Sequence, residues 1–250
     1  MTEGGCRNVY GWRGRIGLIV PSSNTTMECE LIRMLPKGLT LHTARVLQVV
    51  ETEKELLRMA EYAKRAAQEL VSADVDMILY GCTSGSFLKG ETWNRQFTKD
   101  LSGFIKKPVV TTSTAVVEAL KHLGIKELCL VTPYPKETND KAVAWLASVG
   151  VRVVKTIELV KSTYENPITG LEIGAFAPET VYKKIKPHVA ALSVPLFISC
   201  TNLRTIEIIE LLEADLDLPV VTSNQASLWA ALKTLGVRST LEGFGRLLRD

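Results

Sequence analysis

The feature that most constrains the fold of this chain is an internal repeat. Residues 108–124 resemble residues 219–236, with one extra residue in the second copy. Residues 77–83 and 196–201 are also alike, since each is an apolar run that ends in a Cys-Thr pair. A third and weaker match joins the apolar run that leads into Pro21 to a similar run near the middle of the chain. Three matches in the same order indicate a duplicated chain made of two similar halves.

Short apolar runs alternate with stretches of helical periodicity along the chain. Apolar residues recur at helical spacing within residues 54–70, and again from Met27 to Met34, after Ser23 or Asn24 as a helix cap. Such alternation favours an α/β fold of parallel sheets, whose ligands bind beyond the carboxyl ends of the strands. The expected strands are residues 16–20, 39–46, 77–80, 109–110, 128–131, 151–157, 196–198 and 220–221.

The duplication predicts two similar parallel-sheet α/β halves related by pseudo-twofold symmetry. We expect residues 1–112 together with residues 225–250 to form the first half, which carries Cys82, and residues 113–224 to form the second half, which carries Cys200. Both cysteines follow a strand, so pseudo-twofold packing would bring them face to face across an active-site cleft between the halves. The spacing alone also permits two side-by-side domains with separate sites.

Composition and charge exclude several classes of protein. Hydrophobic residues make up 46% of the chain and charged residues 23%, close to the average of globular proteins. The 30 basic and 27 acidic residues are mixed along the chain, so we expect no nucleic-acid partner. The apolar runs fall well short of the roughly 20 residues that span a bilayer, and the N-terminus through Arg15 lacks the apolar segment of a secretory signal. We therefore expect a cytoplasmic protein without a membrane partner.

The sequence carries no signature of a metal or a cofactor. It has no CxxC pair, and neither a GxGxxG nor a GxxxxGK[ST] motif. Its histidines are scattered through segments expected to be strands or helices, which argues against a metal site; they are His42, His122 and His188. Three glutamates have no flanking partner that marks them as bases, so we expect them on the solvated surface; they are Glu28, Glu51 and Glu165.

Cys82 and Cys200 are the candidate nucleophiles. Each ends a strand and enters a turn of small and hydroxyl-bearing residues, whose backbone N–H groups would stabilise a negative charge. A helix beginning beyond each turn, with Thr201 or Asn202 as cap in the second case, would lower the thiol pKa below its reference of about 8.5. A cysteine at a strand end is more often a small buried hydrophobe, but recurrence in both copies favours function. The cysteines without this setting, which we expect to be structural, are Cys6, Cys29 and Cys129.

Polar side chains also follow other strands at the same edge of the sheets. The turn after the first strand holds Ser22 and Asn24, which suit a carboxylate at a helix start, although such residues often only cap the helix. The equivalent turn of the second half holds Tyr134 between two prolines. Asn166 precedes a proline in the loop after the strand at 151–157. An exposed loop position is the alternative for Tyr134 and a plain turn for Asn166.

Together these residues resemble the cofactor-independent aspartate/glutamate racemase superfamily, and within it the maleate cis-trans isomerases. The resemblance runs from Ile16 to residues 243–248, with residues 21–25 and 81–85 as its most specific pieces. The extended, Arg-bearing segment before Ile16 departs from the family pattern. The resemblance implies the duplicated fold, no cofactor, and a homodimer or larger homo-oligomer. It also implies Cys82 as the nucleophile and Cys200 as its partner, and it assigns the substrate carboxylates to Asn24, Tyr134 and Asn166. From the turns we add Ser22, Thr83, Ser84, Thr201 and Asn202 as substrate-binding residues.

The implied reaction is the conversion of maleate to fumarate. The Cys82 thiolate would add to the double bond, the resulting single bond would rotate, and the thiolate would be expelled. Asn24, Asn166 and the N–H groups after both cysteines would stabilise the enolate-like charge, while Cys200 would either transfer a proton or only orient the intermediate. The alternative is an amino-acid or hydantoin racemase that uses the two thiols as acid and base. Arylmalonate decarboxylases keep only the second cysteine, so Cys82 argues against that activity, and a non-catalytic carboxylate-binding protein is the remaining alternative.

Overall fold

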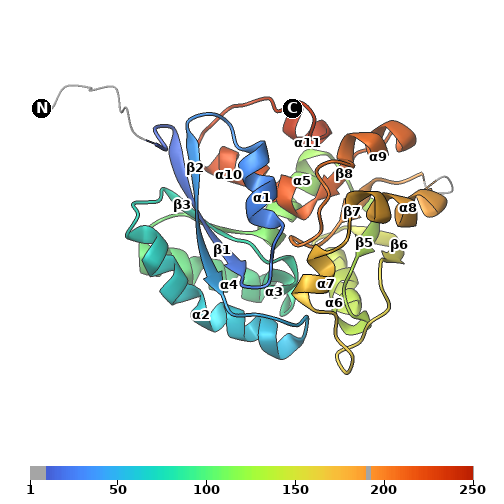
Figure 1. Cartoon of the computed structure of the whole chain (residues 1–250), viewed down its shortest axis with the longest axis horizontal. Helices are drawn as coiled ribbons and strands as arrows, with labels where there is room; N and C mark the ends of the chain where they lie inside the picture. Colours follow the sequence, from blue (N-terminus) through green and yellow to red (C-terminus); the bar gives the residue numbers. More distant parts are fainter. Residues whose placement is uncertain (1–9, 190–192, 250) are drawn as a thin grey trace, which may run out of the picture.

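The computed structural model describes residues 10–189 and 193–249, which form two four-stranded parallel sheets flanked by helices (Figure 1). The first sheet has the strand order β2-β1-β3-β4. The elements of this part of the chain are β1 (Gly14–Pro21), α1 (Met27–Met34), β2 (Leu39–Val46), α2 (Glu53–Val71), β3 (Met77–Tyr80), α3 (Thr83–Phe87), α4 (Gly90–Ile105) and β4 (Val109–Thr111).

The second sheet has the order β6-β5-β7-β8. Its part of the chain holds α5 (Thr112–His122), β5 (Glu127–Thr132), α6 (Lys136–Ser148), β6 (Arg152–Glu158), α7 (Gly170–Gly174), α8 (Pro178–Val189), β7 (Leu196–Ile198), α9 (Ile209–Leu216), β8 (Val220–Thr222), α10 (Ser223–Thr234) and α11 (Arg246–Arg249). Of the helices in the two described ranges, none combines the length and the apolar composition that a bilayer crossing requires.

Corresponding strands occupy corresponding places in the two sheets, which confirms the predicted α/β fold with two similar halves. The strand that ends at a catalytic candidate is internal in each sheet, β3 in the first and β7 in the second. Every residue of β3 and of β7 is buried, because neighbouring strands and helices cover these short apolar segments. The edge strands β2 and β6 are mostly half-exposed. Burial thus fixes both candidate cysteines at the ends of rigid internal strands.

The two halves meet through the two helices of the longest repeat. Helix α5 follows β4 of the first sheet and contacts β8 of the second, whereas α10 follows β8 and contacts α1, β3 and β4 of the first. The two helices also pack against each other. Each helix therefore connects the sheets, and a division of the chain after residues 112 and 224 stays a prediction.

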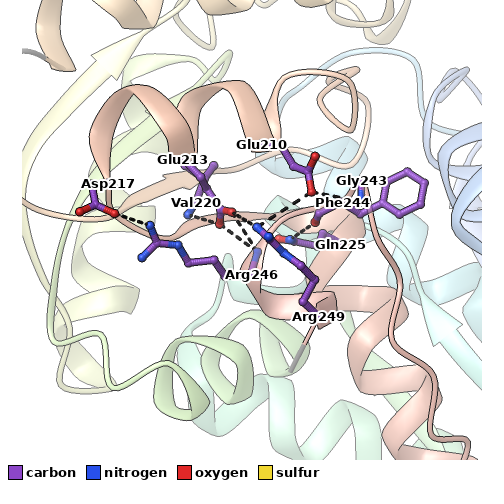
Figure 2. Close-up of polar contacts among 9 residues, drawn as sticks. All are labelled: Glu210, Glu213, Asp217, Val220, Gln225, Gly243, Phe244, Arg246 and Arg249. Carbon is purple, nitrogen blue, oxygen red and sulfur yellow. Dashed lines mark hydrogen bonds and ion pairs between the residues drawn. The ribbon is translucent and has the colours of Figure 1, made fainter.

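The C-terminal segment is bound to α9 (Figure 2). The buried Glu213 carboxylate accepts the N–H of Val220 at 3.1 Å and the N–H of Arg246 at 2.9 Å. Glu210, on the same helix, accepts the N–H of Gly243 at 3.1 Å. Burial raises the pKa of Glu213, and the surrounding N–H donors counteract that rise. These contacts tie the last described residues to the second half.

The helix that we predicted directly after Cys200 begins later. The residues after β7 form turns, and α9 starts only at Ile209, so neither Thr201 nor Asn202 caps it. The reason is a competing partner: the Glu30 carboxylate of α1 accepts the N–H groups of Thr205 and Ile206. The N–H groups of Thr205 and Ile206 thus have a hydrogen-bond acceptor on α1, and they do not need the carbonyl groups of a helical turn.

The remaining cysteines have settings unrelated to the sheet edge. Cys129 is buried in the middle of β5, and Cys29 is exposed on α1. Cys6 lies outside the described residues. A structural role for these cysteines stays a prediction.

Candidate active site

A central cavity lies where the carboxyl ends of the two sheets meet. The first half contributes Asn24, Glu51, Cys82 and Ser84 to its wall, and the second half contributes Tyr134, Cys200 and Asn202. Its free volume is about 20 Å³, enough for roughly one water molecule. The two predicted cysteines share this cavity, and the alternative of two separate sites is wrong.

Cys82 caps the short helix α3 through its sulfur. The Sγ atom accepts the N–H of Gly85 at 3.3 Å and lies 3.8 Å from the hydroxyl of Ser84. The backbone at Cys82 is extended, with φ −143°. A Cβ on residue 85 would lie 2.9 Å from the sulfur, so only glycine lets this N–H approach the thiol so closely. The helix start thus supplies one donor to a sulfur that would carry negative charge.

Cys200 occupies a strained backbone conformation. Its φ is 143°, in the region that favours glycine, and holding a side chain there costs of order 1–3 kcal/mol. Its Sγ atom accepts the N–H of Asn202 at 3.4 Å, and its own N–H donates to the hydroxyl of Ser223 at 3.1 Å. The strain is an observed outlier within the wall of the cavity, where such strain commonly accompanies function.

Both thiols are harder to ionise than free cysteine. Burial and the nearby Glu51 carboxylate together raise the pKa of Cys82 to about 12, although the N–H of Gly85 and the hydroxyl of Ser84 act to lower it. Burial and Glu51 raise the pKa of Cys200 more strongly still. The expectation of lowered thiol pKa values is wrong, because the loss of solvation outweighs one backbone donor per sulfur. Both cysteines are therefore neutral thiols at neutral pH in the absence of a substrate.

Several of the predicted substrate-binding side chains join the two halves. Asn24 accepts the N–H groups of Thr26 and Met27 with Oδ1, and donates from Nδ2 to the Thr201 hydroxyl at 3.0 Å. The N-cap of α1 is Thr26, and not Ser23 or Asn24 as we predicted. Thr201 in turn donates to the carbonyl of Gly81 at 3.2 Å. The amide of Asn24 therefore has one N–H left for a substrate.

The side chains of Thr83 and Asn202 also form hydrogen bonds within the protein. The Thr83 hydroxyl donates to Ser223 at 2.9 Å, and Ser223 receives the N–H of Cys200. Asn202 accepts the N–H of Thr25 at 2.9 Å and donates to the carbonyl of Gly170 at 2.6 Å. These side chains line the cavity, yet their hydrogen bonds mainly hold the two halves in register.

Tyr134 is buried in the wall and not in an exposed loop. Its hydroxyl lies 3.1 Å from the hydroxyl of Ser199, next to Cys200 in sequence. Burial raises the pKa of Tyr134 well above its ordinary value, and the surrounding thiols and Glu51 add to the rise. The phenol is therefore a neutral donor at the second cysteine.

Two of the predicted substrate-binding residues do not reach the central cavity. The Ser22 hydroxyl donates to the carbonyl of Gln48 at 3.3 Å, and Ser22 is absent from the wall. Asn166 is exposed, with its N–H bonded to the hydroxyl of Thr163. Gly170 lines the cavity instead, and a Cβ there would lie 2.1 Å from Oγ of Ser23. This loop therefore contributes main chain at the point where we expected an amide side chain.

Glu51 is the residue that the sequence reading missed. It is only 6% exposed and lines the central cavity, so its expected place on the solvated surface is wrong. The segment that carries it is fixed by a bridge between Val50 and Thr169 and by the Glu51 N–H, which donates to the carbonyl of Ile168 at 3.1 Å. Burial raises the pKa of Glu51 to about 7. Its position just beyond the carboxyl end of β2 was the available signal.

The described residues contain no group of three or more histidine, cysteine, aspartate or glutamate side chains placed to hold a metal ion. The wall of the cavity offers two thiols, one carboxyl group, and hydroxyl and amide donors. Sulfur nucleophiles beside fixed N–H donors suit additions that generate negative charge.

Comparison with known proteins relates the whole fold to one group of enzymes. The sequence profile of the arylmalonate decarboxylase family matches residues 16–248. A curated maleate isomerase from Pseudomonas putida is 30% identical over 248 residues, covering 94% of this chain and 96% of that protein. One from Geobacillus stearothermophilus is 27% identical with the same coverage. Among solved structures, a maleate isomerase variant from Pseudomonas putida S16 with maleate has a TM-score of 0.84 and 26% identity, covering 94% and 97% of the two chains. The predicted likeness to maleate isomerases is confirmed.

Proposed function

The chain belongs to the arylmalonate decarboxylase family and is an enzyme of the isomerase type, and from this premise we propose that it converts maleate to fumarate without a cofactor. The observation that supports this most directly is the central cavity, in which Cys82 and Cys200 come from opposite halves. Two thiols that share one small cavity can act on a single substrate. A cis-trans isomerisation needs a reversible nucleophile and a means of stabilising charge, and this wall contains both.

The first step is the addition of Cys82 to the double bond. Cys82 gives its proton to a water molecule, its sulfur forms a bond to one alkene carbon, and the π electrons move through the other alkene carbon onto the carboxylate attached to it; the proton returns from water when the thiolate is later expelled. The N–H of Gly85 and the hydroxyl of Ser84 stabilise the thiolate before the bond forms. Because the former double bond is now single, the two ends can rotate. Re-formation of the double bond expels the thiolate and leaves fumarate.

Cys200 acts on the intermediate from the second half. In one course its thiol gives a proton to the carbanionic carbon and takes one back before elimination. In the other it only orients the intermediate. Its strained φ of 143° and its contact with Asn202 fix the thiol at the wall in either course. Solvent deuterium distinguishes the two, because only the proton transfer places label on a vinyl carbon.

The substrate carboxylates are assigned to donors of the cavity wall. Asn24, Tyr134 and Asn202 line it, as do Thr83, Ser84 and Thr201 with the backbone after each cysteine. Asn166 and Ser22 would reach a substrate only after their loops rearranged. A racemase of an amino acid or a hydantoin uses the same pair of thiols, and it remains the second candidate because the cysteines lie in one cavity.

The test is proton NMR of the reduced protein with maleate in deuterated buffer. We expect the maleate vinyl signal to be replaced by that of fumarate, and the Cys82→Ala protein to leave maleate unchanged. A protein that leaves maleate unchanged, yet exchanges the α-proton of a single enantiomer of an amino acid or hydantoin, would replace this proposal with the racemase.

A further inference from the structure

The carboxyl group of Glu51 has a different environment from the other buried carboxyl groups. Glu30 accepts three hydrogen bonds, from two backbone N–H groups and from Asn224, and Glu213 is bound by backbone N–H groups in the same manner. In the described chain, Oε1 of Glu51 is buried without any hydrogen-bond partner. A buried polar atom without a partner is rare and calls for an explanation. The nearby side chains of Ser84 and Gln48 lower the pKa of Glu51, but neither forms a hydrogen bond with Oε1, so this oxygen is free to contact what enters the cavity.

The groups that face Glu51 supply no positive charge. Those from the other elements of the wall are the thiols of Cys82 and Cys200 and the phenol of Tyr134, and the phenol of Tyr164 lies near it as well. The described residues that line the cavity include no lysine, arginine or histidine. Lys141 is paired with Glu53, and neither residue lines the cavity. The charge of Glu51 is therefore uncompensated within the cavity.

A dicarboxylate would bring a second uncompensated charge to this wall. Two carboxylates in contact within a buried site repel strongly, and sharing one proton between them relieves the repulsion. Burial already brings the pKa of Glu51 to about 7, so the proton is available near neutral pH and becomes costly at higher pH. A substrate with a carboxamide at that end needs no such proton, because its N–H groups can donate to an ionised carboxylate.

We propose that Glu51 is a specificity-determining residue that contacts one end of the substrate, donating a hydrogen bond to a second carboxylate when protonated and accepting one from an amide when ionised. This rests on the proposed isomerase function. The site then accepts cis-enedioates at and below neutral pH, and above it prefers the monoamides of the same acids. The protonation state of one side chain selects between two classes of substrate that have the same shape.

The experiment compares maleate with maleamate, its monoamide, by following both isomerisations between about pH 7 and 9, where maleate is a dianion. Both substrates need the Cys82 thiolate, so the ratio of their kcat/KM values cancels its titration. We expect the ratio of maleamate to maleate to rise by up to about tenfold for each pH unit above the pKa of Glu51. In the Glu51→Gln protein, whose amide does not titrate, the ratio should not change with pH.

The matched control is Glu53→Gln. It removes the same charge two residues away, from an ion pair with Lys141 outside the cavity. Its ratio should rise with pH as in the unaltered protein. A ratio that is flat in the unaltered protein, or that rises equally in Glu51→Gln, overturns the role of Glu51 and leaves the isomerase function standing.

Binding calorimetry on the Cys82→Ala protein, in buffers of different ionisation enthalpy, tests the same role without turnover. Maleate should bind with uptake of a proton above about pH 7, and maleamate without it. Selective proton uptake in Cys82→Ala, combined with no isomerisation of either compound by the unaltered protein, would support Glu51 and reject the proposed reaction. Equal proton uptake for both ligands, or binding of neither, would overturn the role of Glu51.

Discussion

The two cysteine sites are copies of one another up to the cysteine and differ directly after it. Each follows an internal strand, precedes a threonine, and has a sulfur that accepts one backbone N–H. At Cys82 the backbone is extended, with φ −143°, and α3 begins at the next residue. At Cys200 φ is +143°, and no helix begins before Ile209. Duplication preserved the strand end, and the two turns have diverged in conformation.

This difference separates the roles of the two thiols. Cys82 lies where a helix start offers its donors to a charged sulfur, which suits the nucleophile. Cys200 is fixed by strain and by partners from the other half, since Glu30 of α1 binds the segment that follows it. A side chain held in this manner suits a group that acts on an intermediate formed elsewhere.

The largest effect should come from removing the first thiol. We expect Cys82→Ala to reduce turnover of maleate by at least about a thousandfold, since the covalent step is lost. Cys200→Ala should also lose turnover, but it should retain the ability to form the covalent adduct. Steady-state rates and adduct formation, measured on both proteins, check this. A Cys82→Ser protein with a rate near that of the unaltered enzyme would contradict nucleophilic addition by Cys82.

The pH dependence of the unfolding free energy should reveal the raised pKa of Glu51 in the cavity. In the unfolded chain the pKa of Glu51 is the ordinary glutamate value of about 4.5, and in the folded protein burial raises this pKa to about 7. Between these values the folded state binds more protons, so the free energy of unfolding falls as the pH rises. Glu51→Gln should match the unaltered protein below about pH 4.5 and exceed it above about pH 7, by up to about 3 kcal/mol. Urea unfolding of both proteins across this range checks it, and parallel curves would contradict it.

A substitution at Glu30 should lower the unfolding free energy, whereas Glu51→Gln should raise it at neutral pH. Glu30→Gln would place an amide N–H₂ group against the Nδ2 donor of Asn224, which faces Oε2. We expect a loss of about 2 kcal/mol in unfolding free energy at neutral pH, the usual penalty for a buried donor without an acceptor. Thermal unfolding at one pH compares it with Glu51→Gln. Equal stability of the two variants would contradict a stabilising contribution from the hydrogen bonds of Glu30.

The smallest effect tests the backbone difference directly. At Cys200, glycine should be more stable than alanine by about 1 kcal/mol, because alanine keeps a Cβ at φ 143°. At Cys82, whose φ is ordinary, glycine should be less stable than alanine by about 0.5–1 kcal/mol. Denaturant unfolding of the four proteins gives both differences. The same sign at both sites would mean that the strain at Cys200 is absent in solution.

Part of this site could be predicted from the sequence because it depends on strand ends. The apolar runs before Cys82 and Cys200 are unambiguous, and parallel sheets bring such ends to one edge. Glu51 was missed because a charged residue just before a helix usually faces solvent, and only the contact of residues 50 and 51 with the loop at 168–169 buries it. The late start of α9 depends on Glu30, far away in the sequence. The conformation at Cys200 has no sequence signal, since cysteine rarely adopts a positive φ.

The most direct test of the nucleophile is mass spectrometry of the Cys200→Ser protein after incubation with maleate. We predict a mass increase of one maleic acid molecule, located by peptide mapping on Cys82. The Cys82→Ser, Cys200→Ser double variant controls for addition to the exposed Cys29. An unmodified Cys82 under conditions in which the unaltered enzyme isomerises maleate would contradict covalent catalysis by this residue.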